Sequence, residues 1–435
     1  MLTGRSAGEH GIVGNGWFDR SLGEVQFWKQ SSGLVQSRRV WDAARERAGS
    51  ASRTADGSAF TCANLFWWYA MGSTADFTVT PRPLYPADGR KLPDVWTHPP
   101  RLREELQAKL GPFPLFRFWG PGADIGSTDW IAGAAMELIA RERPTLSLVY
   151  LPHLDYALQK LGPGNRHVRQ DLREIDRVFG VLLSFLQKND IEPIVVSEYG
   201  IAPVSRAVLP NRILRDAGLL SVRDEMGREV LDVFESAAFA VCDHQVAHVV
   251  VRDGSRAGAV HKALEGVDGI DQILDRDAQR AAGIAHGRSG DFVLVSARDA
   301  WFAYPWWHDD SRAPDYARTV DIHRKPGYDP CELFFDPALW TPRLRVARKL
   351  LMRRLGFRTL LDVIPLDPGL VRGSHGRVDN GKEYEPVLIV DDPMVEGPLR
   401  MEGVHDVILR RLFLDEADPP CAPHPIIPTR ASRGS

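Results

Sequence analysis

Apolar runs and helical periodicity alternate in the middle of the chain. The run PTLSLVYLPHLDY is apolar from Leu146 to Leu151 and is interrupted at Pro152, which predicts a buried strand that ends in a loop. The segment VRQDLREIDRVFGVLLSFLQKND then places apolar residues at helical spacing, and IEPIVVSEYGI returns to a short apolar run. This order predicts an α/β fold with a parallel sheet, whose ligands bind beyond the carboxyl ends of the strands.

The pattern changes after Arg206. NRILRDAGLLSVRDEMGREVLDV predicts a helix and a hairpin, SAAFAVCDHQVAHVVVRDG predicts one apolar strand, and AVHKALEGVDGIDQILDRDAQRAAG predicts a charged amphipathic helix. GDFVLVSARDAWFAY then returns to strand. We therefore predict a small inserted or cap-like subdomain at about residues 206–285 within an α/β domain of residues 1–418. A basic helix, RLRVARKLLMRRLGF, follows, and the Pro-rich tail 419–435 is predicted to be disordered.

Composition places the chain among globular proteins. Of its 435 residues 44% are hydrophobic and 26% are charged, so it can bury a large core. The 54 basic and 57 acidic residues are scattered and leave a net charge of -3, which gives no footprint for nucleic acid or an anionic membrane. No apolar run reaches the roughly 18 residues of a membrane span. A small-molecule partner is therefore expected, and the oligomeric state stays open.

The cysteines indicate a reducing compartment. They lie far apart and form no CxxC pair, which argues against a zinc knuckle or a disulfide framework. We therefore expect a cytoplasmic protein, although an N-terminal segment upstream of Met1 would leave export open. The four residues are Cys62, Cys242, Cys331 and Cys421.

Histidine and carboxylate side chains gather where predicted strands enter loops. Divalent metals need unprotonated imidazole and carboxylate ligands on a rigid scaffold. Taken singly, each such residue has a structural alternative, since a strand-end aspartate commonly caps a turn and a lone histidine is commonly a satisfied core or surface group. Their repetition at several strand ends favours a metal site. The candidates are His153, Asp155, Glu198, Asp243, His244, His248, His323 and His375.

Other segments offer substrate contacts. In DIHRKPGYDP, Arg324 and Lys325 follow His323, and two cations beside a metal ligand would suit a phosphate, the alternative being a solvated loop. The aromatic stretches NLFWWYAMG and WFAYPWWHDD are predicted to be mostly core, with a tryptophan rim around a ring-bearing leaving group as the alternative. Neither a nucleotide-binding glycine loop nor a GxSxG elbow is present.

Four motifs in order resemble the type I phosphodiesterase and nucleotide pyrophosphatase branch of the alkaline phosphatase superfamily. LTG with GEHGIVGNG resembles the family's TG..P..HGI..N stretch, YLPHLDYALQKLGPG is similar to PDxxGHxxGP, VVSEYGI to SDHGM, and GSHG to GxHG. The resemblance implies a three-layer sandwich with a mostly parallel central sheet. In the family, the nucleophilic threonine and the first aspartate ligand precede the LTG stretch. It therefore implies that both lie upstream of Met1, and that the chain is truncated there.

The resemblance also implies ligand positions. Gln159 and Tyr199 stand where the family has histidine ligands. We hypothesise that His323 replaces the imidazole missing at position 159, and that Asp243 and His244 replace the one missing at position 199. The expected metal ligands are Asp155, Glu198, His375, His323, Asp243 and His244, with Arg324 and Lys325 as substrate contacts.

The implied function is metal-dependent hydrolysis of small phosphate esters, by a phosphodiesterase or nucleotide pyrophosphatase that uses zinc or manganese. In the family, two ions clamp a phosphoryl oxygen and lower the pKa of the nucleophile and then of water. The alternative is a non-catalytic binding or scaffold protein on the same fold, which the residues at positions 159 and 199 favour. A metal-dependent isomerase or mutase of the same superfamily would require further Asp and His motifs that we do not find.

Overall fold

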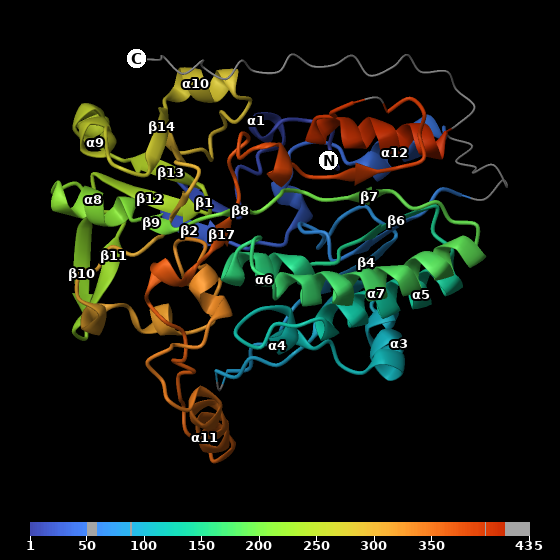
Figure 1. The fold of residues 1–435 in the computed structure, drawn as a ribbon, viewed down its shortest axis with the longest axis horizontal. Coiled ribbons are helices and arrows are strands. Elements are labelled where there is room, and N and C mark those ends of the chain that lie inside the picture. Colours follow the sequence, from blue (N-terminus) through green and yellow to red (C-terminus); the bar gives the residue numbers. More distant parts are fainter. Residues whose placement is uncertain (50–58, 88, 396, 414–435) are drawn as a thin grey trace.

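The molecule has two joined halves. Figure 1 shows a helix-rich half formed mainly by residues 59–188 beside a strand-rich half formed mainly by residues 206–302, and one helix, α11 (Pro342–Arg354), projects away from both. The predicted disordered tail, 419–435, lies outside the described residues. The computed structural model describes residues 1–49, 59–87, 89–395 and 397–413.

A four-stranded sheet in the order β5-β4-β3-β6 forms the centre of the helix-rich half. β3 pairs in parallel with both β4 and β6, whereas β5 pairs antiparallel with β4. β6 begins at Leu146, where the apolar run predicts a strand. The sheet is therefore mixed, with a parallel centre. Its strands are β3 (Cys62–Leu65), β4 (Phe77–Pro81), β5 (Val95–His98) and β6 (Leu146–Val149).

Helices cover both faces of this sheet. Alternate residues of a strand point to opposite faces, so Ala63 and Leu65 pack under α3, α5 and α7, while Cys62 packs with α2 and α12 on the other side. This arrangement confirms the predicted α/β fold and its three layers. The helices are α2 (Val40–Arg47), α3 (Arg101–Leu110), α5 (Gly126–Glu142), α7 (Val168–Lys188) and α12 (Val404–Leu412).

The predicted loop after Pro152 is instead a helix, α6 (His153–Leu161). Proline is tolerated at a helix start because the first N–H groups have no partner within the helix. Tyr156 and Ala157 are buried and lie on the side of α6 that faces the core. As a result, Asp155 and Gln159 lie one turn apart on the same helix. The long helical pattern that follows is confirmed as α7, whose Val178, Leu182 and Leu186 are buried.

An antiparallel sheet in the order β12-β13-β15-β14 forms the strand-rich half. The single strand predicted around Asp243 is a hairpin, and His244 turns the chain with a positive φ of 59°. The predicted amphipathic helix is also divided, because a strand separates α9 from α10. These elements are β12 (Ala238–Asp243), β13 (Val246–Val251), α9 (Ala257–Leu264), β14 (Ile270–Leu274), α10 (Arg276–Ala281) and β15 (Phe292–Ser296).

Short strand pairs join the two halves. β7 (Val195–Val196) pairs antiparallel with β18 (Leu388–Ile389), and not in parallel with β6 as the strand–helix–strand pattern predicts. β8 (Ala202–Pro203) pairs with β17 (Gly373–Ser374). The proposed subdomain boundary at residue 285 falls before β15, a strand of the same antiparallel sheet.

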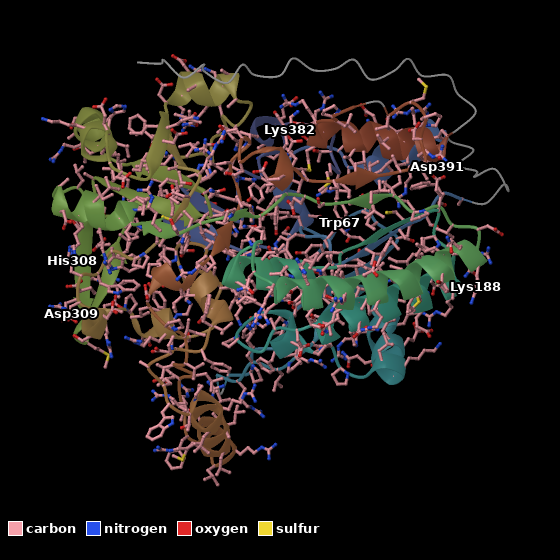
Figure 2. All side chains as sticks on the ribbon, viewed as in Figure 1. Trp67, Lys188, His308, Asp309, Lys382 and Asp391 are labelled. Carbon is pink, nitrogen blue, oxygen red and sulfur yellow. The ribbon has the colours of Figure 1, made fainter. Side chains whose placement is uncertain are left out.

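The remaining elements complete the strand-rich half and the periphery. None of the helices in the described segments combines the length and the apolarity of a membrane crossing. Trp67 lies near the middle of the molecule, whereas Lys188 and His308 lie at its edges (Figure 2). The elements are α1 (Ala7–His10), β1 (Gly16–Asp19), β2 (Glu24–Phe27), α4 (Leu115–Phe118), β9 (Arg206–Val208), α8 (Pro210–Asp216), β10 (Ser221–Glu225), β11 (Arg228–Asp232) and β16 (Ala300–Phe302).

Candidate active site

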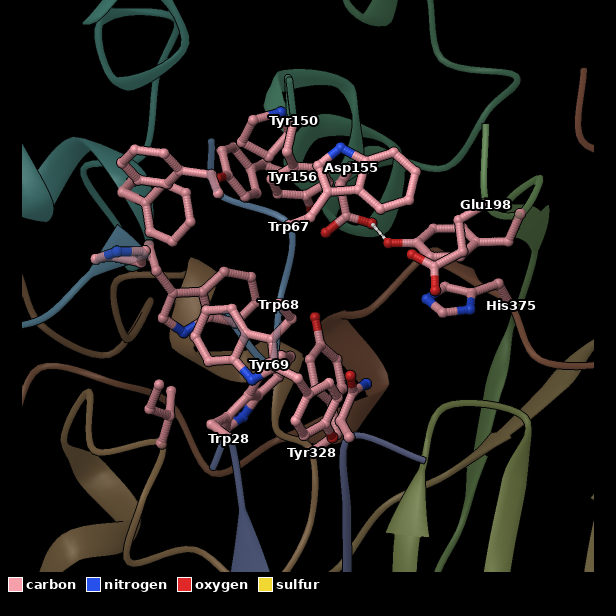
Figure 3. Close-up of a pocket in the computed structure, with 18 of the residues that line it drawn as sticks. Trp28, Trp67, Trp68, Tyr69, Tyr150, Asp155, Tyr156, Glu198, Tyr328 and His375 are labelled. Carbon is pink, nitrogen blue, oxygen red and sulfur yellow. Dashed lines mark hydrogen bonds between the residues drawn. The ribbon is translucent and has the colours of Figure 1, made fainter. Parts of the chain in front are cut away.

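All six expected metal-ligand residues line one pocket, and five of them come from four separate parts of the chain. α6 supplies one, the segment after β7 another, the β12–β13 turn two more, and the segment after β17 the last. Figure 3 shows three of them, Asp155, Glu198 and His375, around the same hollow. The five are Asp155, Glu198, Asp243, His244 and His375.

The two residues that replace the family's histidines both donate to Asp155. Gln159 Nε2 donates to Oδ2 at 2.8 Å, and the Tyr199 hydroxyl donates to Oδ1 at 3.1 Å, the bond drawn in Figure 3. Burial nevertheless outweighs these bonds and raises the pKa of Asp155 to about 6. Each oxygen of this carboxylate therefore already accepts a hydrogen bond.

Tyr199 also covers His375. The two rings are parallel within 5°, with centroids 3.5 Å apart, and His244 lies on His375 with a centroid distance of 3.8 Å. The buried Nε2 atom of His375 has no hydrogen-bond partner among the described residues. Burial lowers the pKa of His375 to about 3, so its imidazole is neutral at physiological pH. A neutral imidazole is the form that binds metals.

Three carboxylates face the pocket, and the charges of two of them act on the third. Burial raises the pKa of Glu198, and the charges of Asp155 and Asp243 raise it further, although the Met1 amino group opposes them. Glu198 keeps access to solvent within the pocket, but the walls displace much of its hydration. Asp243 accepts hydrogen bonds from the Asn15 backbone at 2.7 Å and side chain at 3.0 Å, and burial raises its pKa to about 6.

The residues present do not fit the family's two-ion arrangement. Positions 159 and 199 hold hydrogen-bond donors to Asp155 where that arrangement needs imidazole ligands. Across the described part of the chain, no three ligand atoms of the pocket residues lie within 4.8 Å of one another. The unpartnered His375 Nε2 and the Glu198 and Asp243 carboxylates are the donor groups that remain.

His375 is fixed by the elements on either side of it. A Cβ placed on Gly373 would lie 2.2 Å from the Leu158 carbonyl oxygen, so only glycine allows β17 to approach α6 this closely. The backbone of Arg372 donates to the Gln159 carbonyl at 3.0 Å, and Gln245 in the β12–β13 turn donates to the His375 carbonyl at 2.8 Å. The close approach explains how sequence-distant motifs meet.

His323 lines another part of the same pocket. Its Nδ1 atom lies 3.4 Å from the Phe27 carbonyl oxygen, and the charges that act on it belong to Lys91, Asp321 and Lys29. None of the hydrogen bonds of Asp155 within the described segments involves His323. Replacement by His323 of the imidazole missing at position 159 therefore stays a prediction.

The two predicted substrate cations are placed differently. Arg324 is exposed at the pocket, 3.4 Å from Asp315. Lys325 is buried between Asp329 at 2.7 Å and Glu332 at 2.8 Å and does not line the pocket. Burial opposes the charge of Lys325, but the two carboxylates outweigh it and raise its pKa. Lys325 is thus held in an internal ion-pair network.

Aromatic side chains form much of the pocket wall. Trp67, Trp68 and Tyr69 follow β3 directly, and Trp28 lies against Trp68 with centroids 5.6 Å apart (Figure 3). This part of NLFWWYAMG therefore lines the pocket, although the stretch was predicted to be mostly core. Four consecutive aromatic residues, Phe66 to Tyr69, at the carboxyl end of a strand were the signal for it. Tyr150, Tyr156 and Tyr328 also line the pocket and were not predicted.

The second aromatic stretch, WFAYPWWHDD, behaves as predicted. Trp301, Trp306 and Trp307 are almost completely buried. They belong to two hydrophobic clusters and do not line this pocket. The core interpretation of this stretch is confirmed.

Comparison with known proteins gives distant matches in sequence and in structure. An uncharacterized pyrophosphatase/phosphodiesterase of Schizosaccharomyces pombe is 34% identical over 74 residues, which span 16% of this chain and 15% of that protein. A phosphonoacetate hydrolase from Sinorhizobium meliloti, solved with phosphonoformate, is 16% identical with a TM-score of 0.46, covering 72% of this chain and 70% of that one. Murine ectonucleotide pyrophosphatase/phosphodiesterase 5 is 16% identical with a TM-score of 0.43, covering 86% and 74%.

The family profile covers far more of the chain than the curated relative does. The profile described as type I phosphodiesterase / nucleotide pyrophosphatase matches residues 1–329. That span includes the LTG stretch, the Asp155 motif and the Glu198 motif. The resemblance predicted from these motifs is therefore confirmed, and the chain belongs to the type I phosphodiesterase / nucleotide pyrophosphatase family.

Proposed function

We propose that this protein hydrolyses small phosphate esters, as a phosphodiesterase or nucleotide pyrophosphatase, in the pocket beside α6. The observation that carries the proposal is the meeting of Glu198, Asp243 and His375 in one pocket, with an unpartnered neutral imidazole beside carboxylates of raised pKa. Burial raises the pKa of Asp243, and the charges of Asp155 and Asp243 add to the effect of burial on Glu198. A cation beside such carboxylates would stabilise their charged forms. Family membership supports phosphoester chemistry at this position.

We further propose that one divalent ion, zinc or manganese, binds at Glu198, Asp243 and His375, with His244 beside them. Their ligand atoms must move closer together on binding, since no three of them lie within 4.8 Å of one another in the described part of the chain. When bound, such an ion polarises a phosphoryl oxygen and stabilises the charge that develops on it. Asp155 then serves to orient Tyr199 against His375, through the hydrogen bond of 3.1 Å. Arg324, which is exposed at the pocket, supplies a charge for a second phosphate oxygen.

The aromatic wall supports a substrate with a ring-bearing leaving group. Trp28 and Trp68 meet edge to face at 5.6 Å, and Trp28 lies 6.0 Å from Tyr328. A nucleoside or another planar group would bury apolar surface against such a wall. We therefore propose that the aromatic wall binds the ring of the leaving group, a role that does not require a nucleotide-binding glycine loop.

The test is hydrolysis of bis-para-nitrophenyl phosphate by chelator-treated protein, with zinc or manganese added back. It is run on this chain and on a chain extended upstream in the same reading frame, because the resemblance places the nucleophile before Met1. We expect ion-dependent release of nitrophenol in at least one of the two, abolished by His375→Ala. Absence of release from both folded proteins, at any metal concentration, contradicts the proposal.

A second candidate function is binding without catalysis. The specific observation that favours it is the position of Tyr199, whose ring stacks on His375 while its hydroxyl donates a hydrogen bond to Asp155. In that case the pocket would bind a phosphate ester and leave it intact. Calorimetric binding of bis-para-nitrophenyl phosphate in the presence of zinc, with no hydrolysis product detected by phosphorus NMR, would support this alternative over hydrolysis.

We also propose a cytoplasmic location. Support comes from the three cysteines of the described segments, Cys62, Cys242 and Cys331, which are buried free thiols. Proteins of reducing compartments keep such thiols. Fractionation of the native host, with an antibody to the protein, tests this expectation.

A further inference from the structure

A second group of metal-binding side chains lies outside the pocket, where α6 begins beside α7. His153 is the first residue of α6, and Asp171 and Glu174 lie one turn apart on α7. His153 Nε2 lies 3.3 Å from Asp171 Oδ1 and 3.3 Å from Glu174 Oε2. Within the described residues, this is the group of histidine and carboxylate ligand atoms that all lie within 4.8 Å of one another.

His153 lacks the partners that a buried imidazole needs. Its side chain is 3% exposed, and neither Nδ1 nor Nε2 makes a hydrogen bond within the described part of the chain. A buried polar group left unpaired destabilises the folded state, because it has lost its hydrogen bonds to water. The two carboxylate oxygens approach Nε2 from α7 without meeting hydrogen-bond geometry. The ring is therefore aimed at the carboxylates but is not satisfied by them.

The distances from His153 Nε2 to the two carboxylate oxygens distinguish between a hydrogen bond and a shared metal ion as the partner of the imidazole. An N–H···O hydrogen bond is usually about 2.7–3.2 Å long. By contrast, two ligand atoms that each lie about 2.0–2.1 Å from a tetrahedral ion are roughly 3.3 Å apart. Both observed separations, 3.3 Å, match the second case.

We propose that His153, Asp171 and Glu174 bind a divalent cation of the zinc class, with water as the fourth ligand. The carboxylates are 27% and 33% exposed, so an ion can enter from solvent. Gln170 donates to the other oxygen of Glu174 at 3.0 Å, which orients that carboxylate. This site is independent of the proposed function, because none of its three ligands lines the pocket.

Binding there would fix α6 against α7. α6 also carries Asp155 and Gln159, so the ion would hold the helix on which the pocket carboxylate stands. The expected consequence is a higher melting temperature with zinc than without it, by ligand linkage to the folded state.

The experiment titrates chelator-treated protein with cobalt(II) and records the absorption band of tetrahedral cobalt, together with the zinc-induced shift in melting temperature. The ligand variants are Asp171→Asn and Glu174→Gln, whose half-exposed side chains can change without disturbing the core. Glu137→Gln removes the same charge from an exposed ion pair with Lys109 and is the matched control. His375→Ala removes the pocket ligand.

In the His375→Ala background, we expect the ligand variants to lose the tetrahedral band and to bind cobalt at least about tenfold more weakly, while Glu137→Gln keeps the band and the affinity. A zinc-edge anomalous peak beside His153 Nε2 in crystals would agree. Equal cobalt affinity in Asp171→Asn, Glu174→Gln and the parent protein overturns the proposal, as does a parent protein that binds no ion outside the pocket. Neither result bears on hydrolysis, which is tested separately.

Discussion

Tyr199 and Gln159 give the pocket its individual chemistry. The tyrosine ring covers His375 at a centroid distance of 3.5 Å, and both residues donate a hydrogen bond to Asp155. Where the family resemblance expects imidazole ligands, this chain therefore satisfies the carboxylate internally. Gln159 and Tyr199 thus hydrogen-bond to Asp155 at the two positions where the resemblance expects metal-binding imidazoles.

Restoring the two imidazoles should strengthen metal binding. We expect the double variant Gln159→His with Tyr199→His to bind zinc at least about tenfold more tightly than the parent, because each change adds a ligand beside Asp155. Tyr199→Phe, which keeps the ring but not the hydroxyl, is the control. Calorimetric titration measures the affinity, and an unchanged zinc affinity in the double variant contradicts our account of these positions.

His248 predicts a loss of stability in acid. Its Nε2 lies 3.1 Å from the Val13 carbonyl, its Nδ1 accepts from the Gly290 backbone at 3.1 Å, and burial lowers its pKa from 6.5 to about 4. The unfolded chain takes up this proton below about pH 6.5, whereas the folded protein does so only near pH 4. Stability due to His248 is therefore lost as the pH falls through that window.

Because of His248, the free energy of unfolding is expected to fall by about 2 kcal/mol between pH 7.5 and pH 5.0. Urea unfolding of the parent protein and of His248→Gln at the two pH values measures it. The fall in the free energy of unfolding should be smaller in the variant by this amount. An identical fall in both proteins would show that His248 does not titrate as its environment indicates.

At the scale of elements, the pocket depends on close contact between α6 and β17. Gly373 permits this contact, since a Cβ there would lie 2.2 Å from the Leu158 carbonyl oxygen. The β12–β13 turn holds the other side of His375 through Gln245. Backbone contacts therefore set the position of the unpartnered imidazole.

Gly373→Ala should destabilise the protein by about 2–3 kcal/mol, because β17 must move away from α6. Gly164→Ala is the matched control, since a Cβ at Gly164 meets no atom within 4 Å. Urea unfolding gives the stability, and zinc affinity reports the position of His375. Equal stability of the two variants would mean that this contact can relax without cost.

Periodicity predicted the elements whose signal is local, and missed those set by distant partners. The apolar run at Leu146 and the helical spacing up to Leu186 were sufficient for β6 and α7. The β12–β13 turn was missed because it centres on His244 and Gln245, which are not turn-forming residues. The partner of β7 was missed because β18 lies almost 200 residues away, a pairing that no local pattern encodes.

The pocket was predictable to the extent that motifs mark its residues. Strand ends and motif order identified Asp155, Glu198, Asp243, His244 and His375, which line the same pocket. The burial of Lys325 could not be predicted, because its ion pair with Glu332 depends on how the loop folds back on itself. The group of His153 with α7 was missed because Asp171 and Glu174 look like a solvated helix face in the sequence.

At the scale of the whole molecule, the two proposed sites meet on α6. One end of the helix faces α7 through His153, and the pocket lies at Asp155. The variant Asp171→Asn separates the two sites, because it removes a ligand of the first and leaves the second intact.

The most direct test of the account is zinc-dependent hydrolysis of bis-para-nitrophenyl phosphate by Asp171→Asn, compared with the double variant Asp171→Asn and His375→Ala, both in the chain length that hydrolyses the ester in the test of the proposed function. We predict that the single variant hydrolyses the ester only when zinc is present, and that the double variant loses at least about 100-fold in rate, comparable to the loss of a group that stabilises the transition state. Equal rates in the two proteins would contradict a catalytic ion at His375.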